Sequence, residues 1–285
     1  MNNNDNRSCK MVGLSADELK HVELGVLRYI DKVCSDNGIK YYLAYGTALG
    51  AVRHKGFIPW DDDIDIVMLR SEYERFEKAM SECKGHYKLL SLGTDDHYSI
   101  PYPKVIDSRT LLERTEYRKC PQLGAYVDIF IMDWYSKRDF VNAVDEYILK
   151  KLRQCWEISQ LKNCVGKKAL SRIIAHLIRL CPPRVYAKIM NDYSKRHNNA
   201  GHSNDVNVKH FVLNPVLKSD YSIYGNGTDE EFEGYLFPVP LDKETYLTKA
   251  YGNYMELPPL AERVPKHQNH VFMRCQQDTG QLSVW

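Results

Sequence analysis

The feature that most constrains this chain is a run of four aspartates within five residues. The four are Asp61, Asp62, Asp63 and Asp65. They lie in apolar, β-prone sequence from Phe57 to Val67, which disfavours a solvated acidic turn. If the run is a strand, side-chain alternation places Asp61, Asp63 and Asp65 on one face, with Ile64 and Ile66 on the other. Like charges this close together are unfavourable unless a cation lies among them.

A hard divalent cation with oxygen ligands suits such a cluster. Mg²⁺ is the natural candidate, as one ion or two, because it binds through a few carboxylates together with substrate phosphates. Asp61, Asp63 and Asp65 are therefore the predicted ligands from this run. The sequence predicts a metal site here rather than a simple charged loop.

Asp128 is a further acidic residue in an otherwise apolar strand, Ala125 to Ile131. A buried lone carboxylate is costly without a partner. One interpretation is a structural hydrogen bond to a neighbour. The other makes Asp128 the remaining metal ligand and the base that accepts a proton from an acceptor hydroxyl. Asp133, five residues later, is interpreted as a structural turn residue.

Small and cationic residues precede the acidic run. Gly46 and Thr47 would let the backbone approach a phosphate, and Arg53 and His54 would add positive charge. Lys104 is either a further phosphate contact or an exposed strand lysine. A small-residue turn followed by a strand with paired aspartates is typical of a nucleotidyltransferase-type fold.

Composition excludes several classes of protein. The 39 Lys and Arg balance 37 Asp and Glu, which argues against a nucleic-acid partner. No apolar stretch approaches the roughly 20 residues that span a bilayer, and the polar N-terminus does not resemble a signal peptide. The eight cysteines form no CxxC pair and are expected to be reduced thiols in the cytoplasm.

The periodicities predict an α/β or α+β protein: a mixed sheet flanked by helices, with a mostly helical insertion. Ser15 and Glu18 form a capping box for a helix that Asn37-Gly38 ends. Further expected elements are strands at 39–45, 64–68, 87–92, 102–106, 110–113 and 125–131, and helices from Ser71 to Cys83 and from Asp242 to Gly252. Gly46 to Pro59 is expected to be irregular. Residues 1–12 are expected to be a flexible tail and 13–285 a single catalytic domain, with a helical subdomain at about 139–200.

The segment from Leu43 to Met68 closely resembles the LicD family, which also includes fukutin and fukutin-related protein. Similar blocks follow in family order at 104–110 (KVIDSRT), 124–133 (GAYVDIFIMD) and 246–259 (YLTKAYGNYMELPP). Arg263 and His267 resemble the family's basic ending, and they would either contact the diphosphate or the acceptor or belong to a solvated tail. The chain departs from the family pattern at Ile131-Met132, at Leu260-Ala261 after Pro-Pro, and at Lys266.

The resemblance implies an Mg²⁺-dependent transferase. It would move a substituted phosphoryl group, such as phosphocholine, from a CDP-linked donor to a hydroxyl of a cell-surface glycan or its lipid-linked precursor, and release CMP. Asp63, Asp65 and Asp128 would be catalytic, and catalysis would rest mainly on positioning and electrostatics. Two alternatives remain: a true nucleotidyltransferase that releases pyrophosphate, and a non-catalytic glycan- or nucleotide-binding module.

A basic amphipathic pattern covers residues 167–180. Lys167, Lys168, Arg172, His176 and Arg179 lie opposite the apolar residues Leu170, Ile173, Ile174, Leu177 and Ile178. A helix that packs on the core with a wet basic face is one interpretation. The other is reversible contact with anionic lipids at the inner membrane face, near a lipid-linked acceptor. The 20 tyrosines also allow an aromatic box for a quaternary ammonium group.

Overall fold

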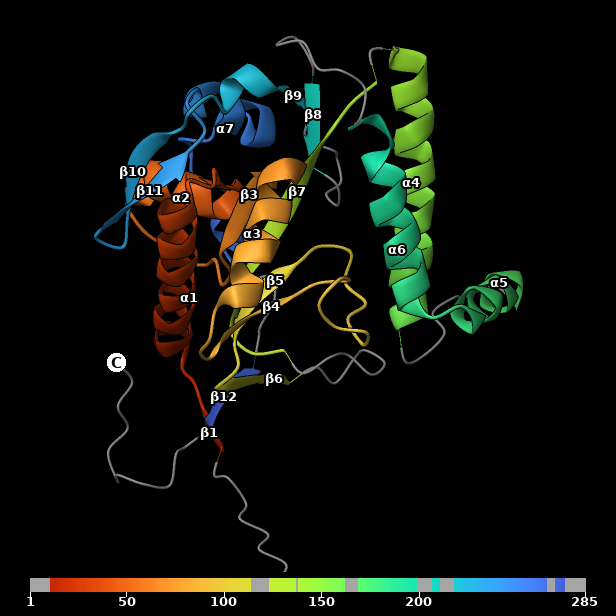
Figure 1. The fold of residues 1–285 in the computed structure, drawn as a ribbon, viewed down its shortest axis with the longest axis horizontal. Coiled ribbons are helices and arrows are strands. Elements are labelled where there is room, and N and C mark those ends of the chain that lie inside the picture. Colours follow the sequence, from red (N-terminus) through yellow and green to blue (C-terminus); the bar gives the residue numbers. More distant parts are fainter. Residues whose placement is uncertain are drawn as a thin grey trace, which may run out of the picture.

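The computed structural model describes residues 11–113, 123–136, 138–161, 169–198, 207–210, 218–265 and 270–274. It has an α+β architecture around one mixed sheet, as the sequence predicts (Figure 1). The sheet order is β2 (Tyr42–Leu43), β3 (Asp65–Leu69), β7 (Tyr126–Trp134), β5 (Lys104–Asp107) and β4 (Tyr87–Leu90). β8 (Asn207–His210) extends the sheet beside β7 and pairs with β9 (Lys218–Asp220). β3 and β7 are parallel, and the other pairs in the sheet are antiparallel.

Helix α1 (Ala16–Asn37) begins and ends as its sequence predicts. The Ser15 hydroxyl accepts from the Glu18 N–H, and the Glu18 carboxylate accepts from the Ser15 N–H at 2.8 Å. Gly38 ends the helix at φ 59°, a left-handed conformation that glycine adopts without strain. The apolar stripe of α1 is buried, and α1 contacts α3 (Arg70–Glu82), β5 and β7. These two helices therefore help to cover the central strands.

Helix α2 (Tyr45–His54) corrects the sequence prediction, which expected a strand to residue 45 and irregular chain after it. The N-cap residue Ala44 has no side chain that can cap a helix. Instead, the Tyr45 N–H donates to the hydroxyl of Tyr246, 3.1 Å away. Tyr45 itself has φ 46°. A tertiary contact thus starts this helix, and no local sequence signal marks it.

The acidic run is also less regular than predicted. β3 begins only at Asp65, so Asp61, Asp62 and Asp63 lie in the loop that precedes it. Strand alternation therefore does not govern the run, and the loop conformation decides where each carboxylate points. The α3 helix likewise has Leu69, not Ser71, at its N-cap.

The segment 139–200 is helical over its described part. It contains α4 (Asp139–Gln160), α5 (Ala169–Leu180), α6 (Pro183–Ser194) and the short 3-10 helix η1 (Lys195–His197). The helical chain breaks at Pro182-Pro183, as expected: Pro182 is the N-cap of α6 and Pro183 is its first residue. Arg184 of α6 ties the group to the body, because its guanidinium donates to the carbonyls of Leu92, Asp95 and Tyr98 at 2.6–2.9 Å.

The remaining elements complete the ends of the molecule. They are the hairpin β10 (Thr228–Phe232) and β11 (Tyr235–Val239), helix α7 (Lys243–Tyr251), the 3-10 helices η2 (Tyr221–Ile223) and η3 (Leu260–Glu262), and a small sheet of β1 (Met11–Gly13), β12 (His270–Arg274) and β6 (Thr110–Glu113). β1 contains Met11 and Val12, the last two residues of the predicted tail, and residues 1–10 lie outside the described part. Asp242 caps α7 and Gly252 ends it, as predicted.

Two further findings concern the thiols and the helices. Within the described chain, Cys34, Cys83, Cys155 and Cys181 are free thiols. Over the same residues, no helix is both long enough and apolar enough to cross a bilayer.

Candidate active site

A row of charged residues crosses the centre of the sheet. The parallel register of β3 and β7 places Asp65 beside Asp128, and the antiparallel register of β5 places Lys104 on the other side of Asp128. The Lys104 ammonium forms an ion pair with the Asp128 carboxylate, and both side chains are buried. The ammonium also lies 3.5 Å from the ring centroid of Tyr126. Lys104 is therefore not an exposed strand lysine. It does not line the pocket that Asp128 borders, and its ammonium pairs with Asp128 from the buried side.

The row borders a pocket of about 920 Å³, a volume in the range of small-molecule sites. All four predicted metal ligands line it: Asp61, Asp63, Asp65 and Asp128. The two strands contribute the last two, and the loop before β3 contributes the first two. The fold thus brings together carboxylates that are up to 67 positions apart in the sequence, from 61 to 128.

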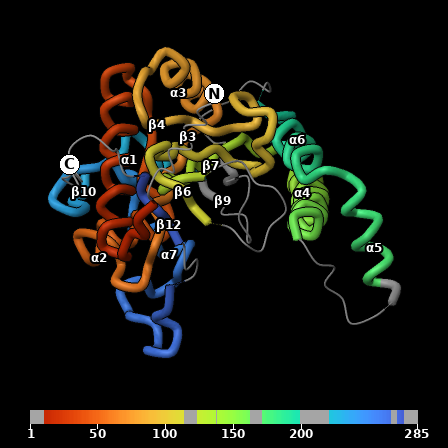
Figure 2. Tube along the Cα trace, turned by 90° about the horizontal axis from the view of Figure 1, so that it is seen from below, coloured from red at the N-terminus to blue at the C-terminus, as the bar shows by residue number. Residues whose placement is uncertain are grey.

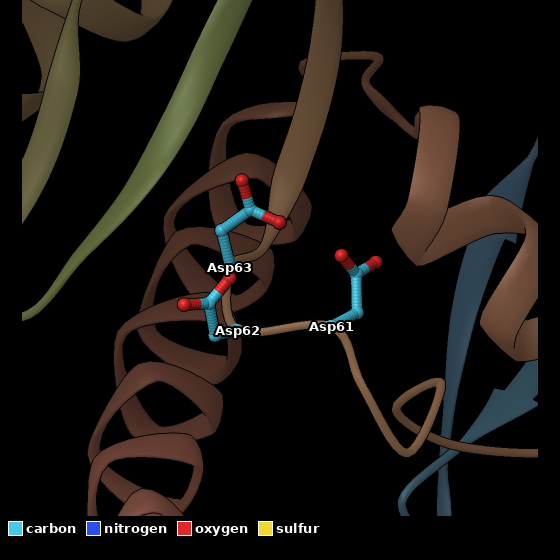
Figure 3. A group of neighbouring side chains, drawn as sticks. All are labelled: Asp61, Asp62 and Asp63. Carbon is cyan, nitrogen blue, oxygen red and sulfur yellow. The ribbon is translucent and has the colours of Figure 1, made fainter. Parts of the chain in front are cut away.

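The loop aspartates form a compact group of their own. One carboxylate oxygen each of Asp61, Asp62 and Asp63 lies within 4.8 Å of the others. Figure 3 shows that Asp61 and Asp63 direct their carboxylates to the same side, whereas Asp62 turns toward α1. Asp62 does not line the pocket. A cation that also touches substrate needs ligands on the pocket wall, so Asp65 and Asp128 fit that role better than Asp62.

The electrostatics of the pocket are strongly unbalanced. Burial raises the pKa of Asp65 well above its ordinary value, and the nearby charges of Asp63, Asp128 and Asp61 raise it further. Glu23, on α1, is fully buried behind the loop. Its pKa is raised by burial first and then by Asp63 and Asp62. Lys104 opposes both shifts. A divalent cation bound to oxygen ligands would relieve this repulsion, so the residues present fit Mg²⁺.

Gly46 and Thr47, the predicted phosphate contacts, both lie against aspartates of the acidic segment. A β-carbon at position 46 would lie 2.2 Å from Asp61 Oδ2, so only glycine lets Asp61 approach the start of α2 this closely. The Thr47 hydroxyl is buried and accepts from the Asp65 N–H at 2.8 Å. These two residues therefore shape the acidic end of the pocket.

The predicted cationic residues occupy different places. Arg53 lines the pocket, and its Nη1 donates to the carbonyl of Tyr254 at 2.6 Å. His54 is not on the pocket wall; it accepts from Arg53 Nε at 3.3 Å, and burial followed by the Arg53 charge lowers the His54 pKa. Arg263 lies over the Trp60 ring, 5.3 Å from its centroid, and donates to the Pro258 carbonyl. His267 lies outside the described residues.

Several pocket residues carry no local sequence signal. Arg153 and Trp156 line the pocket from α4. Their spacing of three residues predicts that they share a helix face, but it does not predict which part of the molecule that face contacts. The pocket also has an aromatic wall, consisting of Tyr45, Trp60, Tyr102, Phe130, Trp156, Tyr251 and Tyr254. Abundant tyrosine was visible in the sequence, but which tyrosines converge could not be read from it. The block at 246–259 contributes Tyr251 and residues 253, 254 and 256–259 to the pocket.

The fold and the site together define a class: a mixed-sheet α+β protein with four aspartates in one aromatic-walled pocket. Residues 38–165 match the family model described as "LicD/FKTN/FKRP, nucleotidyltransferase domain". The lipopolysaccharide cholinephosphotransferase LicD of Haemophilus influenzae is 30% identical over 92% of this chain and 100% of its own length. An uncharacterized protein of Rickettsia prowazekii is 30% identical over 43% of this chain and 42% of its own length. The chain belongs to the LicD family.

Proposed function

We propose that this protein transfers a substituted phosphoryl group, such as phosphocholine, from a CDP-linked donor to a hydroxyl of a cell-surface glycan or its lipid-linked precursor, with release of CMP. The carrying observation is the convergence of Asp61, Asp63, Asp65 and Asp128 in one pocket that is backed by the buried Lys104. The similarity to a cholinephosphotransferase extends over that relative's full length. The reaction would take place on the cytoplasmic side of the membrane.

The four pocket aspartates would hold Mg²⁺, as one ion or two. Bound there, the metal would neutralise charge on the donor diphosphate and on the departing CMP. The residues themselves would position the reactants: Lys104 fixes Asp128, and Thr47 fixes the start of the strand that carries Asp65. Arg53 would meet phosphate from the pocket wall while its hydrogen bond to Tyr254 fixes its direction.

Asp128 would accept the proton of the acceptor hydroxyl as that oxygen bonds to phosphorus. It lies on the pocket wall, and the buried Lys104 ammonium balances its charge. In a loose phosphoryl-transfer transition state the hydroxyl proton leaves late, so a carboxylate is basic enough for this role. The bond that breaks joins that same phosphorus to the bridging oxygen, which leaves with CMP.

The aromatic wall supports a cationic substituent. A quaternary ammonium group is attracted to the faces of tyrosine and tryptophan rings without a need for hydrogen bonds. Pocket aromatics such as Trp60, Tyr102 and Trp156 lie in the same cavity as the carboxylates. A choline group therefore fits this wall better than an uncharged ribitol or glycerol, which would leave polar hydroxyls against aromatic carbon.

The decisive experiment identifies the products. The full-length protein is incubated with Mg²⁺, CDP-choline and a lipopolysaccharide or lipid-linked glycan acceptor, and the phosphorus species are followed by ³¹P NMR. CMP together with a phosphodiester on the glycan supports the proposal. Pyrophosphate release or a cytidylylated product would instead indicate a nucleotidyltransferase.

A donor screen needs no acceptor and separates binding from turnover. Thermal unfolding is measured with CDP-choline, CDP-ethanolamine, CDP-ribitol and CDP-glycerol, each with and without Mg²⁺, since a ligand that binds only the folded state raises the midpoint. The largest shift is expected for CDP-choline with Mg²⁺. The matched control, Asp36→Asn, changes an exposed aspartate of α1 outside the pocket and should behave as the wild type. No shift with any donor would indicate that the pocket does not bind CDP-linked compounds.

A further inference from the structure

Helix α5 leaves its apolar face in solvent. Among residues 171–180, whose burial the structure describes, the small Ala175 is the buried one, at 4% exposed, and α5 contacts α4. The large side chains Ile173, Ile174, Leu177 and Leu180 are 57%, 48%, 61% and 80% exposed. At 100° per residue these four share one side of the helix. A helix that packs on a core hides such a stripe, so the core-packing interpretation does not describe this face.

The charge of α5 is entirely positive. The helix ALSRIIAHLIRL contains no Asp or Glu, and Arg172, His176 and Arg179 follow one another at helical spacing along the edge of the apolar face. The whole chain has a formal net charge of only +2, so this positive helix is a local feature. An apolar face bordered by cations complements a surface that offers acyl chains beneath negative headgroups.

The place of α5 in the fold leaves this face accessible. Both views show α5 on the outer side of α4 and α6, away from the central sheet (Figures 1 and 2). The helical group is fastened to the body by Arg184 and by Trp156, whose indole N–H donates to the Ser99 carbonyl at 2.7 Å. The same Trp156 lines the pocket. Anchoring α5 at a surface would therefore hold the pocket close to that surface as well.

We propose that α5 is a docking helix for an anionic bilayer surface, with its apolar face in the headgroup–acyl boundary and the exposed Arg172 against lipid phosphates. The helix has 12 residues and lies in the interface rather than across it, since about 20 are needed to span. A second copy of this chain is the less favoured occupant, because pairing two such faces would bring their cations together. The proposal rests on α5 alone and does not require the proposed transfer reaction.

The test is co-sedimentation of the full chain with vesicles, without donor or acceptor. Vesicles of phosphatidylcholine with phosphatidylglycerol should bind the protein, and pure phosphatidylcholine should bind it much less. High salt should weaken the binding. Leu177→Glu should reduce partitioning at least about tenfold, because it places a charge in the apolar face. Arg172→Gln should reduce it about fivefold, as expected for the loss of one cation near an anionic surface.

A matched control distinguishes binding through the apolar face of α5 from nonspecific adsorption to vesicles. Leu236 is 66% exposed on β11, and β11 lies on the opposite side of the molecule from α5 (Figure 1), so Leu236→Glu should bind vesicles as the wild type does. Circular dichroism checks that each variant is folded. Equal vesicle binding by Leu177→Glu and wild type would overturn the proposal. Absence of binding, together with a dimer that Leu177→Glu dissociates, would instead assign the face to a second copy.

Discussion

Strand β7 carries two buried aspartates, and they differ in what surrounds them. Asp133 is 0% exposed and receives two hydrogen bonds from Arg70, at 2.9 and 2.7 Å, and one from Asn198 at 2.6 Å. Asp128 is 6% exposed and pairs with Lys104, but it shares its pocket with three further aspartates. Arg70 balances the charge of Asp133, whereas negative charge is in excess around Asp128. Burial of an acid therefore does not indicate function by itself, and the excess of negative charge around Asp128 is what makes this pocket the candidate site.

The largest effect is expected in the aspartate pocket, where negative charge is in excess. Asp63→Asn or Asp65→Asn should reduce turnover by about 10²–10³-fold or more, because in the proposed mechanism each would remove charge that positions the metal and stabilises the transition state. The fold should persist or gain stability, since like-charge repulsion is relieved. Steady-state kinetics and thermal unfolding measure the two effects. Full wild-type activity in excess EDTA would remove the metal from the mechanism.

At the charge-balanced pair of Arg70 and Asp133, a substitution should lower stability and leave activity unchanged. Arg70→Met leaves Asp133 buried without its cation and should cost about 3–5 kcal/mol of unfolding free energy. Activity per folded molecule should stay near the wild-type value, because neither residue lines the aspartate pocket. Urea unfolding is the measurement, and Arg75→Met, at an exposed arginine of α3, is the matched control. A stable but inactive Arg70→Met variant would contradict the assignment of this pair to structure.

A third change tests the role of Asp128 within the excess group. Asp128→Asn keeps the shape of the side chain but removes its basicity, so kcat should fall by about 10²-fold. Donor binding should weaken less than kcat falls, if the residue acts mainly on the acceptor proton. Comparing kcat with the donor dissociation constant from calorimetry separates the two effects. A normal kcat would exclude Asp128 as the base but would not contradict the proposed metal site.

The smallest effect concerns pH and Glu23. Its folded-state pKa is raised above the ordinary 4.5, so the unfolded chain loses this proton at lower pH than the folded chain does. The stability associated with the protonated group is complete below about 4.5 and is lost as the pH rises through the folded pKa. Glu23→Gln should abolish this loss in metal-free protein and raise the unfolding midpoint at neutral pH by roughly 2 °C or more. The exposed control Glu74→Gln should leave the pH profile unchanged, and an unaltered Glu23→Gln profile would refute this linkage.

Local signals in the sequence were sufficient wherever neighbouring residues decide the structure. The Ser15–Glu18 capping box, the Gly38 terminus and the strand at 110–113 are found as predicted. The four pocket aspartates were also identified, because an acidic cluster within apolar sequence is costly to fold unless a cation balances it. The conformation of this segment was predicted wrongly, because the prediction placed Asp61 and Asp63 on a strand that begins only at Asp65.

The parts that escaped prediction depend on contacts between distant residues. Lys104 pairs with Asp128 because strand register brings them together, and no sequence pattern specifies that register. Helix α2 begins where a tyrosine 201 positions away accepts its first N–H. The phosphate contact of Gly46 and Thr47 stays a prediction. The structure adds that Gly46 lies against Asp61 and that the Thr47 hydroxyl accepts from the Asp65 N–H, two contacts that no local pattern predicts.

The hydrogen bond between Tyr45 and Tyr246 also bears on how the protein is made. During synthesis, the acidic loop leaves the ribosome long before α7, and Arg53 meets the Tyr254 carbonyl only after that later segment has emerged. These two contacts of the pocket therefore form only after residues 246–254 have been synthesised. Contacts of such long sequence separation also slow folding. Until α7 docks, the pocket lacks the part of its wall that Tyr251 and residues 253, 254 and 256–259 supply.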